Sequence, residues 1–211
     1  MTLDKLRPLS NKAIRPFVAG ADRLGVTPNM VTTFSVVVAA LAGYALYLAG
    51  SDPTWYLVGA ALVLFTGFLD VLDGALARET GLAADSGDFL DHVLDRYGDV
   101  VILAGFALGA DRPVLGMAVL AGVLLTAYLG TQGHALDLGR IYGGLLGRAD
   151  ILVLVGTISI VAAFANPPLY GFTVVEWGLI VLVILSHITA LQRFYWAWEE
   201  LAERERVDDG R

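Results

Sequence analysis

Four aspartates in an otherwise apolar sequence are the residues best suited to chemistry. Asp70 and Asp73 are spaced i,i+3 at the end of one apolar stretch, and Asp91 and Asp95 are spaced i,i+4 at the start of the next. Each spacing places both carboxylates on one face of a helix. Two antiparallel helices joined by a short loop would bring all four to the same depth. Because charged side chains are costly inside apolar helices, the cluster indicates a functional site.

Neighbouring carboxylates repel one another strongly in a medium of low dielectric constant. Hard divalent cations relieve this repulsion, and a ligand set made only of oxygens suits Mg²⁺ or Mn²⁺, with Ca²⁺ as an alternative. Four carboxylates are enough for two ions about 3.5–4 Å apart, which stabilise the attacking and leaving oxygens of a phosphoryl transfer. Gly74 and Gly87 leave room for a bulky ligand, and Arg78 can bind a phosphate. These residues predict a site for a metal-bound diphosphate.

The rest of the chain is apolar enough to place this site in a membrane. Of its 211 residues, 56% are hydrophobic and 17% are charged, and the mean hydropathy is +0.67. These values exclude disorder, collagen and coiled coil. Six stretches, each close to the ~20 residues that cross a bilayer, predict an all-α, polytopic membrane protein with six transmembrane helices. We expect these spans at 30–50, 53–78, 91–110, 113–136, 151–175 and 173–196.

We expect a single membrane domain over residues 1–211. In residues 1–24 apolar and basic side chains alternate, which predicts an N-terminal amphipathic helix in the membrane interface. Residues 30–196 form the six-helix bundle and residues 199–211 form a polar tail. With the N-terminus inside, thirteen of the 14 Lys and Arg residues lie on the inner side and Arg112 lies on the outer side. The positive-inside rule then places both termini and the active site at the cytoplasmic face of the cell membrane.

Charge and cysteine content exclude other classes of function. A net charge of −7 disfavours nucleic acid as a partner. The chain has no cysteine, which excludes disulfides, thiolate zinc sites, Fe–S clusters and cysteine nucleophiles. The lack of a Ser–His pair near the acids also favours direct displacement over a covalent intermediate. The main alternative to an enzyme is a cation-coupled or proton-coupled membrane transporter that uses the aspartates as a relay.

The segment between residues 70 and 95 closely resembles the signature of the CDP-alcohol phosphotransferase family. It reads Asp70-Val-Leu-Asp73-Gly74-Ala-Leu-Ala77-Arg78, eight residues, Gly87, three residues, Asp91, three residues and Asp95. The six-span plan extends the resemblance over nearly the whole chain. The resemblance implies an enzyme that transfers a phosphatidyl or archaetidyl group from a CDP-linked lipid to a small alcohol and releases CMP. It also implies dependence on Mg²⁺ or Mn²⁺ and a homodimer.

The same resemblance implies roles for individual residues. Asp70, Asp73, Asp91 and Asp95 would bind the metal ions, and Asp95 would also be the general base that accepts the proton of the acceptor hydroxyl. The CDP-lipid would be bound by seven residues, namely Asn29, Thr32, Gly74, Ala77, Arg78, Ala84 and Gly87. Many members have a hydroxyl residue at the position of Ala84, so any nucleotide contact there must come from the backbone in this chain.

The acceptor pocket is expected at the cytoplasmic ends of the last three spans. Its candidate residues are Gln132, Arg148 and Arg193, and two arginines near the metal site suit an acceptor that carries its own phosphate. Members that use inositol phosphate usually carry a Lys or Arg where this chain has the uncharged residues 130–132. This departure counts against inositol phosphate. The two arginines predict a polyol phosphate such as glycerol phosphate or inositol phosphate. The alternative is an unphosphorylated acceptor such as serine or inositol.

Overall fold

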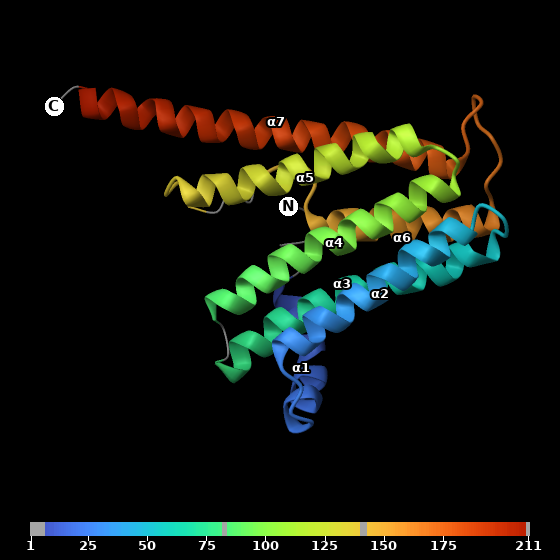
Figure 1. Cartoon of the computed structure of the whole chain (residues 1–211), viewed down its shortest axis with the longest axis horizontal. Helices are drawn as coiled ribbons and strands as arrows, with labels where there is room; N and C mark the ends of the chain where they lie inside the picture. The colour runs from blue at the N-terminus through green and yellow to red at the C-terminus, as the bar shows by residue number, and fades with distance from the viewer. Residues whose placement is uncertain (1–6, 82–83, 140–142, 210–211) are drawn as a thin grey trace.

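The computed structural model describes residues 7–81, 84–139 and 143–209, and within them it is all-helical, as predicted (Figure 1). Six helices lie roughly side by side, and the N-terminal helix crosses them at one end. The helices are α1 (Arg7–Arg23), α2 (Pro28–Leu48), α3 (Thr54–Thr80), α4 (Asp85–Gly109), α5 (Pro113–Ala135), α6 (Arg148–Phe164) and α7 (Val174–Asp209).

Helices α2–α7 alternate in direction along the chain. The N-termini of α2, α4 and α6 therefore lie at the same end of the bundle as the C-termini of α3, α5 and α7 (Figure 1). We call this the aspartate end, because Asp70 and Asp95 lie there. Helix α2 packs against α3 and α4, α5 packs against α4 and α7, and α6 packs against α3 and α7. Fully buried side chains such as Leu46, Phe106 and Leu179 form a core common to these helices.

Glycines bring the backbones of α2 and α4 into close contact. A Cβ atom at Gly43 would overlap the carbonyl group of Val101, and one at Gly105 would overlap the backbone of Gly43. Farther along, a Cβ atom at Gly109 would overlap the carbonyl group of Leu46. Small residues allow this approach between helices in membrane proteins. The tight contact fixes α4, and with it Asp91 and Asp95, relative to α2.

Local signals explain where α2 begins and where α3 ends. The hydroxyl of Thr27 accepts a 3.4 Å hydrogen bond from the backbone N–H of Met30, and Pro28 occupies the first position of α2. Helix α3 ends at Gly81, whose φ of +67° is the left-handed conformation typical of a C-terminal glycine. Helix α4 begins at Asp85 and runs antiparallel to α3, as the aspartate spacing requires (Figure 1).

Four helices, α2, α3, α5 and α7, are long and apolar enough to cross a membrane. Helix α6 has only 17 residues, and α4 carries Asp91, Asp95, Arg96 and Asp99 along its length. The described helices therefore support a membrane protein with several spans, and the count of six stays a prediction.

Helix α6 ends at Phe164, earlier than the predicted end at residue 175. The reason is the Asn166-Pro167-Pro168 sequence, because proline lacks an N–H and disfavours helical backbone in the residue before it. The side-chain oxygen of Asn166 instead accepts a 2.9 Å hydrogen bond from the backbone N–H of Val174. This contact joins the loop to the start of α7.

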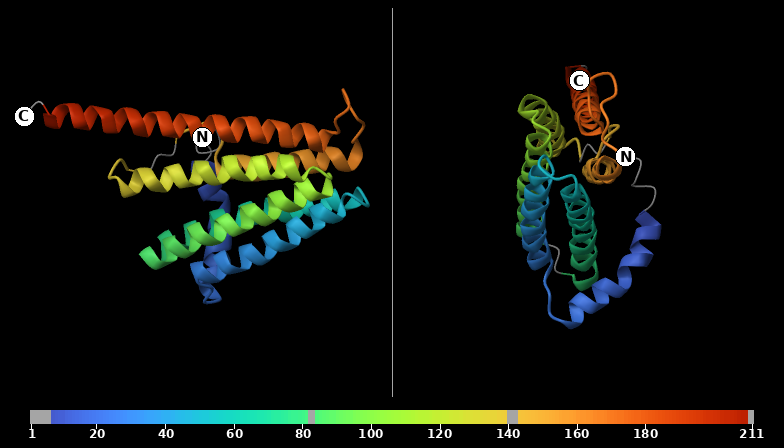
Figure 2. Two further views of the ribbon diagram at one scale, coloured as in Figure 1. Left: turned by 45° about the horizontal axis from the view of Figure 1, so that its top comes forward. Right: turned by 90° about the vertical axis from the view of Figure 1, so that its right-hand side faces the viewer.

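Helix α1 lies across one side of the bundle, close to the start of α2 (Figure 2). Its side chains Ile14 and Val18 are buried in a cluster with residues of α2 and α3. Phe17 packs edge-on against Phe68 of α3, with 5.1 Å between ring centroids. The apolar face of the predicted amphipathic helix thus packs on protein. Residues 1–6, which that prediction included, lie outside the described residues.

Helix α7 runs without a break from Val174 to Asp209, past the predicted boundary between a span ending at 196 and a tail starting at 199. Its C-terminal turns extend beyond the other helices at the aspartate end (Figure 1). Nη2 of Arg204 donates a 3.1 Å hydrogen bond to the carbonyl oxygen of Asp137, just after α5. The extension therefore contacts the segment that follows α5.

Candidate active site and metal centre

The structure brings together three of the four aspartates of the signature. Asp70 comes from α3, and Asp91 and Asp95 come from α4. Each offers a carboxylate oxygen, and these oxygens all lie within 4.8 Å of one another. All three side chains are partly buried. The antiparallel arrangement of α3 and α4 thus brings these three carboxylates together.

Asp73 lies beside this group and is more deeply buried, with 5% of its surface exposed. Its Oδ2 accepts a 2.9 Å hydrogen bond from the hydroxyl of Thr32 on α2. The sequence analysis expected Thr32 at the nucleotide site, and it gave no indication of this contact across 41 residues of chain. Thr32 therefore holds the orientation of the Asp73 carboxylate.

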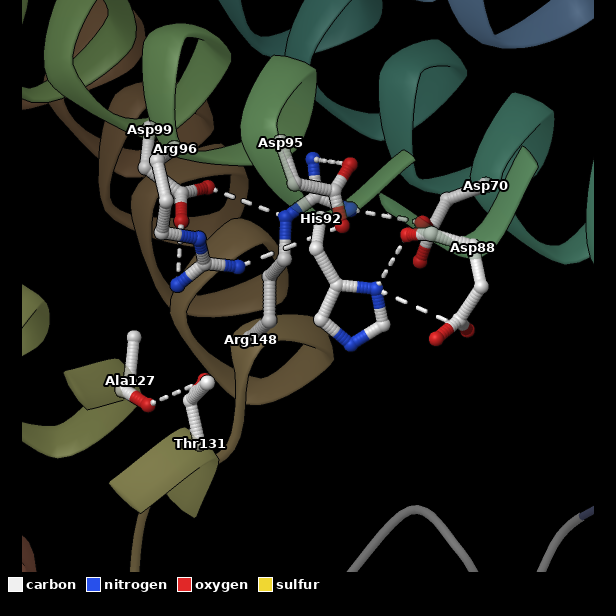
Figure 3. A network of polar contacts seen from close by, with 9 residues as sticks. All are labelled: Asp70, Asp88, His92, Asp95, Arg96, Asp99, Ala127, Thr131 and Arg148. Atoms are coloured by element: carbon white, nitrogen blue, oxygen red, sulfur yellow. Dashed lines mark hydrogen bonds and ion pairs between the residues drawn. The ribbon is translucent and has the colours of Figure 1, made fainter. Parts of the chain in front are cut away.

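Arg148, the first residue of α6, inserts its guanidinium among the acids (Figure 3). Nη1 lies 2.7 Å from Oδ1 of Asp70, Nη2 lies 2.9 Å from Oδ1 of Asp95, and Nε lies 3.0 Å from Oδ1 of Asp99. The Arg148 side chain is 14% exposed. It thus contacts two of the three clustered carboxylates and compensates part of their charge. Local sequence spacing carries no signal for this contact.

Asp99 is a fifth acid at the site, one that was expected to pair with Arg96 and was not among the predicted site residues. Its side chain is 1% exposed, and its Oδ2 lies 3.1 Å from Nη1 of Arg96. Arg96 also lies near Asp95, with 3.9 Å between Nη2 and Oδ2. The signal in the sequence was the i,i+4 spacing, because Asp91, Asp95 and Asp99 form one row on α4.

One buried atom shows that the aspartates fit a divalent cation. Oδ1 of Asp91 is buried and has no hydrogen-bond partner in the described part of the chain. An unsatisfied buried polar atom is costly, and native structures contain few of them. A hard cation bound among Asp70, Asp91 and Asp95 would satisfy this oxygen, and carboxylate oxygens are the ligands that Mg²⁺ and Mn²⁺ prefer.

A cavity of about 760 Å³ lies beside the aspartates, between α4, α5, the start of α6 and α7. Arg96, Arg148 and Arg193 line it, which gives it three cationic side chains. Two of these were predicted to contact the acceptor. The third candidate, Gln132, is half-buried and is not among the lining residues, although its neighbour Thr131 is.

The residues expected to bind the nucleotide lie around the starts of α2 and α4 and the end of α3. A Cβ atom at Gly87 would lie 3.2 Å from Oδ1 of Asn29, so these two residues are adjacent. A Cβ atom at Gly74 would lie 3.4 Å from Nη1 of Arg78, one turn farther along α3. Ala77 is half-buried. Ala84 is exposed at the N-cap of α4, where it makes no side-chain hydrogen bond.

Comparison with known proteins agrees with this geometry. A sequence model of the CDP-alcohol phosphatidyltransferase family matches residues 25–188. The archaetidylinositol phosphate synthase of Pyrococcus horikoshii is 32% identical over 201 residues, which cover 94% of this chain and 98% of that protein. The phosphatidylinositol phosphate synthase of Mycolicibacterium smegmatis is 34% identical over 194 residues, which cover 87% of this chain and 83% of that protein.

Solved structures of the phosphatidylinositol phosphate synthase of Mycobacterium tuberculosis share the fold. The structure with manganese and citrate has a TM-score of 0.75 and 27% identity, and covers 88% of each chain. The structure with CDP-DAG bound has a TM-score of 0.76 and 27% identity, and covers 89% of this chain and 94% of that chain. These matches favour the enzyme over the transporter that the intramembrane acids left open. The chain belongs to the CDP-alcohol phosphatidyltransferase family of membrane enzymes.

Proposed function

We propose that this protein transfers a phosphatidyl or archaetidyl group from a CDP-linked lipid to inositol phosphate and releases CMP. The observation that carries the proposal is the convergence of Asp70, Asp91 and Asp95 beside a cavity lined by three arginines. In this reaction an acceptor hydroxyl forms a bond to the lipid-side phosphorus. The bond from that phosphorus to the CMP oxygen breaks, and the hydroxyl proton moves to the protein.

Asp70, Asp91 and Asp95 would hold a divalent cation, and Asp73 would complete the ligand set. The unpartnered oxygen of Asp91 supports this assignment, as does the manganese in the mycobacterial relative. When bound, Mg²⁺ or Mn²⁺ neutralises the diphosphate and the charge that develops on its leaving oxygen. Four carboxylates suffice for two ions.

Asp95 is the proposed general base because of its position between the acids and the cavity. Its carboxylate contacts both Arg148 and Arg96, and both of these arginines line the cavity. An acceptor in the cavity therefore lies next to this carboxylate, which can accept a proton from its hydroxyl. Asp70 lies on the other helix, α3.

The nucleotide end of the donor would lie over the starts of α2 and α4. The missing side chain at Gly87 keeps the space next to Asn29 open. Arg78 is exposed and makes no ion pair with any residue that the structure describes, so its guanidinium is free to bind a phosphate. The full proposed set is Asn29, Thr32, Gly74, Ala77, Arg78, Ala84 and Gly87.

The acceptor would occupy the cavity, with its phosphate near Arg148 and with Arg193 as a second candidate contact. A cavity with three arginines suits an anionic acceptor better than serine or free inositol. Relatives from archaea and from actinobacteria are named as inositol phosphate lipid synthases, which favours inositol phosphate over glycerol phosphate. Gln132 is a weaker candidate because it does not line the cavity.

The membrane arrangement is part of the proposal. The chain forms one multi-pass domain over residues 1–211 with six spans, and its aspartate end faces the cytoplasm. The excess of Lys and Arg at that end supports this orientation. A homodimer is proposed from the resemblance to the family.

A panel of acceptors tests this function. Purified protein is given CDP-diacylglycerol or CDP-archaeol with Mn²⁺, and then inositol phosphate, glycerol phosphate, inositol or serine. We expect CMP release with inositol phosphate and, by mass spectrometry, a lipid that carries phosphorylated inositol. Release with only another acceptor would overturn the choice of inositol phosphate. No release with any acceptor would overturn the proposed function.

A further inference from the structure

The backbone of residues 143–147, which leads into Arg148, is bonded to side chains of α7. The N–H of Leu146 donates to the Thr189 hydroxyl at 3.1 Å, and the N–H of Leu145 donates to Oε1 of Gln192 at 3.2 Å. This segment lies outside any helix or strand, so these side chains supply partners for its backbone. The Leu146 N–H is buried and would be costly to leave unpaired, whereas the bond from Leu145 is exposed.

Arg193 adds two further contacts to the same assembly. Its Nε donates to the carbonyl oxygen of Gly143 at 3.0 Å, and its Nη1 donates to the carbonyl oxygen of Thr126 on α5 at 2.7 Å. The residue is 6% exposed. Two of its three guanidinium nitrogens therefore bind backbone carbonyls, one in the 143–147 segment and one in α5.

The segment also lies too close to α7 to carry side chains at its first two positions. A Cβ atom at Gly143 would overlap the ring of Trp196. Gly144 has a φ of +126°, which only glycine adopts readily, and a Cβ atom there would overlap the methyl group of Thr189. Shape and hydrogen bonding thus fix the same stretch of backbone.

We propose that one face of α7 positions Arg148, and that Arg193 is a positioning residue. The face consists of Thr189, Gln192, Arg193 and Trp196, whose spacing of i, i+3, i+4 and i+7 places them on one side of the helix. Through the 143–147 segment it sets where the Arg148 guanidinium meets Asp70 and Asp95. Its effect on the acceptor rests on the proposed function, whereas its effect on the segment does not.

Thr189→Val removes the hydroxyl that accepts from Leu146 and keeps the side-chain shape. We expect the KM for inositol phosphate to rise about tenfold, with kcat and the KM for the CDP-lipid changed less than about twofold. Thr189→Ser keeps the hydroxyl and restores the KM. Thr66→Val is the matched control, because Thr66 is equally buried and its hydroxyl bonds only within its own helix.

Two further measurements need no acceptor. Hydrogen exchange of the Leu145 and Leu146 amides should accelerate about tenfold in Thr189→Val and stay unchanged in Thr66→Val. Mn²⁺ should bind about threefold more tightly in Thr189→Val, because a displaced Arg148 competes less for Asp70 and Asp95. This gain should vanish in an Arg148→Gln background. Unchanged exchange, or a gain in Mn²⁺ affinity that persists without Arg148, would overturn the inference even if the wild-type protein proves inactive with inositol phosphate.

Discussion

The two halves of the bundle contribute to the site in different ways. In helices α2–α4, the acid half, the acids come from one short stretch of α3 and α4. The antiparallel packing of these helices brings carboxylate oxygens of Asp70, Asp91 and Asp95 within 4.8 Å of one another. Helices α5–α7, the cavity half, supply Arg148 and, together with one face of α4, line the cavity. There the contacts run through backbone carbonyls and amides, such as those of Thr126, Gly143 and Leu146.

Under the proposed function, the acid half would hold the metal and the CDP group, and the cavity half would select the acceptor. The shape of the cavity half depends on how α7 holds one segment of backbone. We therefore expect mutations in the acid half to abolish turnover and mutations in the cavity half to change acceptor preference.

The largest effect is expected at the proposed base. Asp95→Asn should lower CMP release by about 1,000-fold, since the amide cannot accept the hydroxyl proton. Its remaining side-chain oxygen should keep the Mn²⁺ dissociation constant within about tenfold of the wild-type value. Steady-state CMP release and Mn²⁺ titration by EPR measure the two effects. Retained turnover would refute Asp95 as the base, and Asp22→Asn on α1 is the control.

A smaller and different effect is expected at Arg148, where the two halves meet. Arg148→Gln should lower kcat/KM for the acceptor about 50-fold through loss of a charge-assisted contact. The same change should tighten Mn²⁺ binding, because a cation no longer lies 2.7–2.9 Å from Asp70 and Asp95. Arg112→Gln, at the opposite end of the bundle, should leave both constants unchanged. Weaker Mn²⁺ binding in Arg148→Gln would show that the arginine supports the metal site rather than competing with it.

The smallest of these effects is expected at Thr32, within the acid half. Thr32→Val removes the hydrogen bond to Asp73 and should weaken Mn²⁺ binding about fivefold, with the KM for inositol phosphate unchanged. Thr33→Val is a matched control, because the hydroxyl of Thr33 is exposed and donates only to the carbonyl of Asn29. A change in the KM for inositol phosphate as large as the loss of Mn²⁺ affinity would contradict the division of roles between the acid half and the cavity half.

The sequence predicted the acid half well because its information is local. Helical periodicity gives the faces of α3 and α4. The sequence also predicted that Asp99 pairs with Arg96, as it does, but it did not place Asp99 in the site, although this residue continues the row on α4. The sequence analysis also extended the fifth span to residue 175, past the prolines that end α6 at Phe164.

The cavity half could not be predicted to the same depth because its contacts are tertiary. Arg148 was expected at the acceptor, but nothing in its neighbours in the sequence places it against Asp70, Asp95 and Asp99. Arg193 was expected to bind the acceptor. Its hydrogen bonds to the carbonyl oxygens of Gly143 and Thr126 could not be predicted, because every residue has a carbonyl group and no sequence pattern marks the one that accepts. Thr189 was not singled out for the same reason.

The central claim is that Asp70, Asp91 and Asp95 hold a divalent cation, and Mn²⁺ titration by EPR tests it most directly. We expect the signal of free Mn²⁺ to be lost saturably with wild-type protein. In Asp91→Ala, which removes the unpartnered buried oxygen, binding should weaken by at least about 100-fold. Equal Mn²⁺ binding by the wild type and Asp91→Ala, or no saturable binding by either, would contradict the claim.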